Sequence, residues 1–170
     1  RQTARLNIPV TYRAAGTSLS GQAITDSVLM VATHEWRKYT ILDDEALKIK
    51  LQPGITGARA NIHLQPFGRK IGPDPASINA AMIGGIAANN ASGMCCSTDQ
   101  NSYKTIADIR IVLYDGTILD TSDEKSKLDF TEKHPEIIRE IEKLRDKIKA
   151  DNTLTERIKQ KYKIKNTTGY

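Results

Sequence analysis

The chain has 170 residues, of which 39% are hydrophobic and 5% aromatic, and its net charge is +5. This length suits a single domain with a buried core, and the low aromatic content offers no stacking platform for single-stranded nucleic acid. The two cysteines, Cys95 and Cys96, are neighbours, so a disulfide framework is excluded and a reducing, cytoplasmic compartment is expected. No apolar run approaches the roughly 18 residues of a membrane helix.

The first fifty residues predict four short strands, because runs of β-forming residues alternate with turn residues. The predicted strands are residues 10–14, 28–32, 39–42 and 47–51. The last two form a hairpin around an acidic turn, which a Gln-Pro-Gly sequence at 52–54 closes. We interpret Asp43, Asp44 and Glu45 as turn residues and not as paired catalytic acids.

Two helices and a second hairpin follow. Thr56 predicts the N-cap of a helix that ends before Pro66. Ser77 predicts the cap of a short helix through Met82, which two glycines at 84–85 end. The Asp-Gly pair within residues 114–116 predicts a turn between strands 109–113 and 117–119.

Beyond Asp123 the sequence becomes highly charged. Apolar residues from Ile137 to Ile148 fall on one helical face, with Pro135 in the first turn, and Leu154 and Ile158 indicate a second helix. The fold class predicted is α+β, a mostly antiparallel sheet flanked by helices. We expect a sheet-rich core at 1–122 and a charged helical pair at 123–165.

Chemistry is indicated first by the loop that follows the first strand. Residues 15–21 carry almost no bulky side chain, so their backbone N–H groups can approach a ligand closely and form a nest for phosphate oxygens. Thr17, Ser18 and Ser20 add hydroxyl groups. The loop matches neither a Walker motif nor the Gly-x-Gly-x-x-Gly fingerprint. An ordinary flexible loop is the alternative reading.

A second segment, residues 84–93, is also rich in glycine, alanine, serine and asparagine. If both segments line one long ligand, small residues provide the close backbone approach, and Asn89 and Asn90 supply amide groups for a ring edge or a ribose. The alternative is a tight packing corner between a helix and a strand.

These residues carry a family resemblance. Residues 13–22, 52–54, 68–77 and 84–93 resemble the FAD-binding (PCMH-type) domain of the vanillyl-alcohol-oxidase superfamily, and the chain corresponds to its second lobe. Within that superfamily the whole chain is most similar to FAD-linked D-2-hydroxyacid dehydrogenases that carry a C-terminal iron–sulfur region. D-lactate and D-2-hydroxyglutarate are typical substrates of that group.

The resemblance implies a set of cofactor contacts. Residues 15–21 correspond to the pyrophosphate loop, residues 53–54 lie near the flavin, residues 73–77 shape the isoalloxazine pocket, and residues 84–93 flank the ribityl and diphosphate groups. The residues implied to bind FAD are Ala15, Gly16, Thr17, Ser18, Leu19, Ser20, Gly21, Gln22, Pro53, Gly54, Pro73, Asp74, Ser77, Gly84, Gly85, Ala88, Asn89, Asn90, Ser92 and Gly93.

The chain also departs from the family pattern. It begins at Arg1 and lacks the family's first βαβ lobe, its last flavin-contacting strand and its cap domain, which supplies the substrate-binding arginine, metal-binding histidines and the general base. We therefore expect a piece of a larger enzyme that is inactive alone and has no catalytic or metal residue of its own. Ser97 and Asp99 stand where the family has glycine and alanine. Two cysteines cannot hold an iron–sulfur cluster, which needs four ligands.

The remaining candidates have no pattern of a site. His34, His63 and His134 lack metal-ligand spacing and are expected on the surface or in packing roles. Cys95 and Cys96 are expected to be small buried residues, with redox sensitivity near a flavin as the alternative.

Three functions remain open. The first is an FAD-binding piece of an oxidoreductase that oxidises a D-2-hydroxy acid by hydride transfer to flavin. The second is the same fold in another FAD enzyme, of the murein-precursor-reductase or alcohol-oxidase type. The third is a basic module that binds RNA or another polyanion. The expected partners are a small 2-hydroxy acid bound through the absent cap and an electron acceptor of unknown kind, with no nucleic acid and no membrane span, although the parent protein could attach to the inner membrane.

Overall fold

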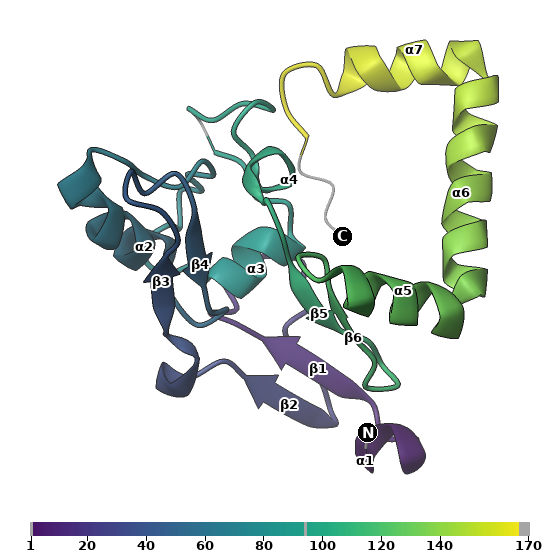
Figure 1. The fold of residues 1–170 in the computed structure, drawn as a ribbon, viewed down its shortest axis with the longest axis horizontal. Coiled ribbons are helices and arrows are strands. Elements are labelled where there is room, and N and C mark those ends of the chain that lie inside the picture. Colours follow the sequence, from purple (N-terminus) through teal and green to yellow (C-terminus); the bar gives the residue numbers. More distant parts are fainter. Residues whose placement is uncertain (1, 94, 167–170) are drawn as a thin grey trace.

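A computed structural model describes residues 2–93 and 95–166. It combines three two-stranded sheets with helices (Figure 1). The strands are β1 (Val10–Arg13), β2 (Val28–Val31), β3 (Tyr39–Ile41), β4 (Ile49–Leu51), β5 (Arg110–Val112) and β6 (Ile118–Asp120). The α-helices are α1 (Gln2–Arg5), α2 (Gly57–Leu64), α3 (Ile83–Ala88), α4 (Ser102–Thr105), α5 (Glu124–Lys133), α6 (Pro135–Ala150) and α7 (Asn152–Lys161). Two 3₁₀ turns are η1 (His34–Trp36) and η2 (Gln65–Phe67).

The first sheet pairs β1 with β2 in parallel. Val10 lies opposite Val28, and the amide of Ala32 extends the ladder by donating to the carbonyl oxygen of Arg13 at 2.9 Å. Every residue of β2 is exposed, although parallel sheets are normally covered on both faces. The other two sheets are antiparallel, as predicted. The fold class is thus confirmed, with the strands in separate small ladders.

The hairpin of β3 and β4 has the acidic turn that the sequence predicts. Both carboxylate oxygens of Asp43 accept backbone hydrogen bonds at 2.8 Å, one from Leu47 and one from Lys48. The amide of Leu47 is the main cause of the lowered pKa of Asp43. Ala46 is buried in the left-handed conformation, with φ of 50°. Asp43 therefore stabilises the turn, and Asp44 and Glu45 lie within it, as predicted.

Buried apolar residues gather at α2 and α3, where Ala81, Ile86 and Ala91 form a hydrophobic cluster. The Thr56 hydroxyl caps α2 by accepting a hydrogen bond from the amide of Arg59 at 3.2 Å, as predicted. The helix buries Ala60 and Leu64, and Ile55, two residues before the helix begins, is 1% exposed. Because Ile55 directly follows the 53–54 segment, this core fixes the position of a predicted cofactor segment.

The predicted helix from Ser77 to Met82 is wrong. Residues 76–80 form turns, and Met82 instead makes an isolated antiparallel bridge with Thr56. The amide of Gly57 donates to the carbonyl oxygen of Ala81 at 3.0 Å. These long-range backbone bonds hold residues 81–82 extended, so a helix, α3, begins only at Ile83, where the predicted helix would already have ended. Its two glycines, Gly84 and Gly85, lie inside the helix and do not end it.

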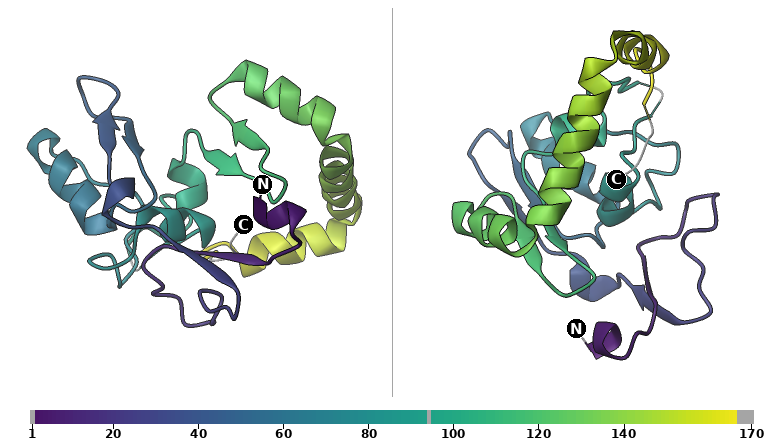
Figure 2. Two further views of the ribbon diagram at one scale, coloured as in Figure 1. Left: turned by 90° about the horizontal axis from the view of Figure 1, so that it is seen from below. Right: turned by 90° about the vertical axis from the view of Figure 1, so that its right-hand side faces the viewer.

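The C-terminal part contains three helices, not the predicted pair. The Asp-Gly hairpin of β5 and β6 is confirmed, and α5 follows it directly. Asp123 caps α5 by accepting from the amide of Lys125 at 3.0 Å. The sequence did not indicate α5, because Leu128 and Phe130 are too few apolar residues to define a helical period. Figures 1 and 2 show α5, α6 and α7 as three successive sides of an open frame; we call these helices the arm.

Candidate functional site

The loop after β1 is exposed and bounded by left-handed glycines. Gly16 has φ of 69° and Gly21 has φ of 77°, a conformation that glycine adopts without steric cost. All four residues between them are exposed, and Leu19 is fully so. The loop extends away from the rest of the chain (Figure 2). Its backbone is therefore accessible to a ligand, as a phosphate nest requires.

Helix α3 packs its first turn against the 53–55 segment. The amide of Ile83 donates to the carbonyl oxygen of Ile55 at 2.8 Å, and that of Gly84 donates to the carbonyl oxygen of Pro53 at 3.0 Å. A side chain at Gly84 would bring its Cβ to 2.7 Å from the Cβ of Pro53. Glycine is thus required there by protein packing, and the first two amides of α3 are already used within the protein.

The next residue, Gly85, is different. It is exposed, and a Cβ there would lie 3.7 Å from the Cβ of Ala14, an ordinary contact. Ala14 directly precedes the exposed loop 15–21. The first turn of α3 and the start of that loop are therefore neighbours, so the two segments poor in side chains meet at this point.

The end of the second segment packs on Asp74. A Cβ on Gly93 would lie 1.9 Å from Oδ1 and 2.1 Å from the carbonyl oxygen of Asp74. Oδ1 is buried and has no hydrogen-bond partner among the described residues. Buried polar atoms in native proteins nearly always have a partner, which can be a water or a ligand. The thiol of Cys96 lies in the same place, and burial raises its pKa.

Helix α4 holds residues 86–91 in place through hydrogen bonds. The Oδ1 atom of Asn90 accepts from the amide of Tyr103 at 2.9 Å. The hydroxyl of Ser102, which is 2% exposed, lies 3.0 Å from the carbonyl oxygens of both Ile86 and Ala91. Asn101 caps α4 by accepting from the amide of Lys104. Sequence reasoning missed this support, although an Asn-Ser pair before a helix is a capping signal.

Three contacts link the segment 84–93 to other predicted segments: Gly84 packs on Pro53, Gly93 packs on Asp74, and Gly85 faces Ala14 at the end of β1. Pro73, Asn90 and Ser92 are buried, whereas Ser77, Ala88 and Asn89 are exposed. The side-chain oxygen of Asn90 already accepts a hydrogen bond from the amide of Tyr103 in α4. For all twenty residues, direct contact with a cofactor stays a prediction.

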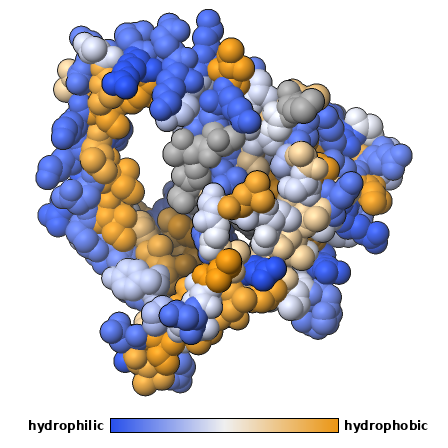
Figure 3. All heavy atoms as spheres, turned by 180° about the vertical axis from the view of Figure 1, so that it is seen from behind, coloured by the Kyte–Doolittle hydropathy of each residue, from blue (hydrophilic) through white to orange (hydrophobic). Residues whose placement is uncertain are grey.

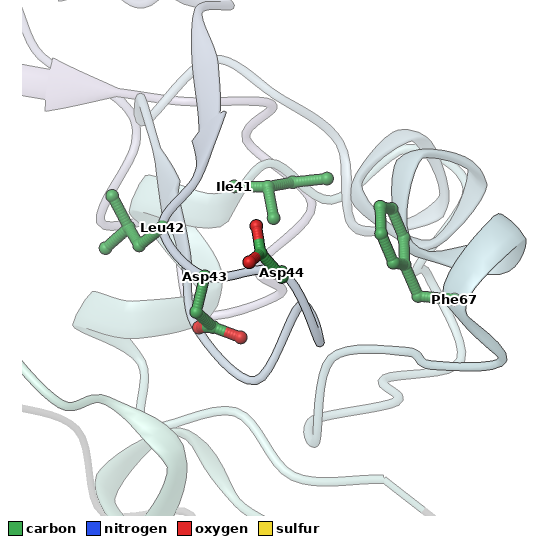
Figure 4. Close-up of a pocket in the computed structure, with 5 residues that line it drawn as sticks. All are labelled: Ile41, Leu42, Asp43, Asp44 and Phe67. Carbon is green, nitrogen blue, oxygen red and sulfur yellow. The ribbon is translucent and has the colours of Figure 1, made fainter.

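A separate hollow of about 290 Å³ lies between the β3–β4 turn and η2 (Figure 4). It is lined by Ile41, Leu42, Asp43, Asp44 and Phe67. Asp43 is occupied within its own turn, and none of the predicted cofactor residues lines this hollow.

The remaining candidates have structural roles or none. His63 stacks on Tyr39 with ring centroids 3.7 Å apart, and burial lowers its pKa. His134 is buried, and His34 is exposed. Both cysteines are free, but Cys95 is exposed, which corrects the expectation of two buried residues. Within residues 2–93 and 95–166, no cluster of three His, Cys, Asp or Glu side chains is suited to a metal ion.

None of the helices that the structure describes has both the length and the apolar character needed to cross a bilayer.

Curated relatives are dehydrogenases and oxidases of hydroxy acids. The chain is 27% identical over 111 residues to D-2-hydroxyglutarate dehydrogenase of Escherichia coli (strain K12), a match that covers 65% of this chain and 11% of that protein. It is 28% identical over 116 residues to glycolate oxidase subunit GlcD of the same strain, covering 68% and 23%. It is 32% identical over 119 residues to D-lactate dehydrogenase [cytochrome] 1, mitochondrial, of Saccharomyces cerevisiae, covering 68% and 20%. The chain thus spans less than a quarter of each relative.

A solved structure of alkyldihydroxyacetonephosphate synthase shares the fold. Its TM-score is 0.60 at 18% identity, with 74% of this chain and 25% of that chain covered. The profile of the FAD binding domain family matches residues 1–122, which include every predicted cofactor segment. The chain therefore belongs to the FAD binding domain family, and FAD is confirmed as its cofactor.

Proposed function

We propose that this chain holds the FAD of an oxidoreductase that oxidises a D-2-hydroxy acid by hydride transfer to the flavin. The observation that carries the proposal is the packing of residues 84–93, whose ends rest on Pro53 and Asp74 while Gly85 faces the loop after β1. The names of the relatives, D-2-hydroxyglutarate dehydrogenase and D-lactate dehydrogenase among them, supply the substrate class. Residues 1–122 form the FAD-binding part in this proposal, and residues 123–165, which include the arm, are an addition to it.

The residues present fit the cofactor. A dinucleotide has a pyrophosphate at its centre, and an exposed loop with two left-handed glycines is suited to bind it through backbone N–H groups. Gly85 leaves room beside that loop. Oδ1 of Asp74 is buried beside Gly93 and the Cys96 thiol and has no hydrogen-bond partner among the described residues.

Each segment then has a defined task. The loop 15–21 binds the pyrophosphate through backbone N–H groups, and its hydroxyl side chains at 17, 18 and 20 add donors. The 53–54 and 73–77 segments form walls that exclude water from the ring system. When bound, FAD supplies the hydride acceptor, and the chain supplies position and polarity. The substrate-binding residues and the general base belong, in this proposal, to other parts of the complete protein.

The test is anaerobic reduction of the flavin in the complete natural protein. We expect D-2-hydroxyglutarate, D-lactate or another D-2-hydroxy acid to bleach the flavin absorbance, while the L-enantiomer of the same acid acts much more slowly. Glycolate, which has no stereocentre, serves as a further substrate of the same class. A protein that binds FAD but is reduced by none of these acids would reject the substrate class and favour another FAD enzyme of the same fold.

A further inference from the structure

One end of the arm is fixed by a cluster of four side chains: Asp115, Thr117, Lys133 and His134. Lys133 at the end of α5 lies with its Nζ 3.0 Å from Oδ2 of Asp115 and also contacts the hydroxyl of Thr117. The Nε2 atom of His134, which is 6% exposed, lies 3.1 Å from the same hydroxyl. We call these four residues the root cluster. Its central atom is the Thr117 hydroxyl, which contacts all three partners.

Hydrogen bonds and opposite charges hold the root cluster together. The Thr117 hydroxyl donates to Asp115 at 2.7 Å and the Thr117 amide donates at 2.8 Å. These bonds, with the charge of Lys133, hold the pKa of Asp115 well below its ordinary value. On the far side of the imidazole, Nδ1 of His134 lies 3.5 Å from Oε1 of Glu136, the second residue of α6. The cluster thus joins the β5–β6 turn to both α5 and α6.

The middle of the arm keeps large apolar side chains exposed among the described residues. The apolar residues of α6 line the inner edge of the frame and border an opening (Figure 3). Ile141 is 61% exposed and Leu144 is 59% exposed. A helix of this length gains most of its stability from packing, so the position of α6 depends on the two ends of the arm.

The other end of the arm contacts the residues that follow the predicted cofactor segment 84–93. Just after α7, the carbonyl oxygen of Lys163 accepts a hydrogen bond from the hydroxyl of Thr98 at 3.3 Å. Thr98 stands two residues after the buried Cys96, whose thiol lies beside Asp74 and Gly93. The preceding residue, Ser97, has φ of 46°, a conformation that costs free energy and needs support from its surroundings.

We infer that the arm is a strap: the root cluster fixes one end, the Thr98 contact fixes the other, and the strap holds residues 95–99 in place behind the segment that ends at Gly93. Loosening the root cluster then loosens residues 95–99 and weakens FAD binding, although no residue of the cluster belongs to the predicted cofactor set. The effect on FAD rests on the proposed function. The effect on residues 95–99 does not.

The experiment compares three threonine-to-valine variants of the complete protein, which remove a hydroxyl and keep the side-chain shape. Thr117→Val breaks the root cluster, and Thr98→Val breaks the contact at the other end. Thr131→Val is the matched control, because among the described residues its hydroxyl donates to the carbonyl oxygen of Lys127 within the same helix, α5. Hydrogen exchange is measured without FAD, and FAD affinity is measured by fluorescence titration.

Thr117→Val should speed amide exchange about tenfold in the arm and also in residues 95–99, the change expected when a buried hydrogen-bonding group loses its partner. FAD affinity should fall about fivefold, the lower end of typical coupling between sites. Thr98→Val should speed exchange at 95–99 and 162–166 and leave α5 unchanged, and Thr131→Val should match the natural protein.

The strap is disproved if Thr117→Val speeds exchange only in the β5–β6 hairpin and α5, or if Thr98→Val leaves residues 95–99 unchanged. A natural protein that fails to bind FAD would reject the proposed function, while the exchange results without FAD would still decide the strap. Faster exchange at 95–99 with unchanged FAD affinity would overturn the coupling to the cofactor.

Discussion

Replacement of Gly93 by alanine is expected to lower the free energy of unfolding by about 3 kcal/mol, the upper part of the range for overpacked sites, and to abolish measurable FAD binding. The new Cβ would lie 1.9 Å from Oδ1 and 2.1 Å from the carbonyl oxygen of Asp74. Both distances are far below contact distance, so the segment after Asn90 would have to move. Urea unfolding and FAD titration measure the two effects.

A second substitution separates the two clashes at Gly93. Asp74→Ala removes Oδ1 but leaves the backbone carbonyl in place. The double variant Asp74→Ala with Gly93→Ala should therefore remain destabilised relative to Asp74→Ala alone. If the double variant is as stable as Asp74→Ala, the backbone approach is not what requires glycine at this position.

Replacement of Gly85 by alanine should have opposite effects on stability and on binding. Gly85 is exposed inside α3, and its Cβ would meet only Ala14 at 3.7 Å, so the free energy of unfolding should rise by about 0.5–1 kcal/mol, the usual gain for alanine over glycine in a helix. FAD affinity should fall about tenfold to a hundredfold, because the methyl group would occupy space that the pyrophosphate needs.

Gly68→Ala is the matched control for Gly85→Ala. Gly68 has φ of 66° and open space around its Cβ position, so alanine there should cost about 1 kcal/mol of conformational strain and leave FAD affinity unchanged. Equal FAD affinity in the natural protein and in Gly85→Ala would show that the pyrophosphate does not bind beside α3.

Local sequence patterns predicted the elements whose structure depends only on neighbouring residues. The cap at Thr56, the Asp-Gly turn at 115–116 and the apolar face of α6 need only neighbouring residues, and the structure confirms all three. The helix expected at 77–82 failed because backbone partners far along the chain, at Thr56 and Gly57, hold residues 81–82 extended. Such partners leave no periodic signal in the sequence.

The candidate site was predictable as a set of segments but not as a set of contacts. Scarcity of side chains marked 15–21 and 84–93, yet it could not distinguish the three glycines of the second segment. Gly84 is required by Pro53 and Gly93 by Asp74, whereas Gly85 meets no such constraint within the protein. The structure, and not the sequence, therefore identifies Gly85 as the glycine that leaves space for a ligand.

The most direct test compares the amide exchange of the complete natural protein with FAD and with riboflavin, which lacks the pyrophosphate. FAD should protect the amides of residues 15–21 together with those near Gly85, and riboflavin should leave residues 15–21 unprotected. Protection of residues 15–21 by neither compound, or equally by both, would contradict the assignment of this loop to the pyrophosphate.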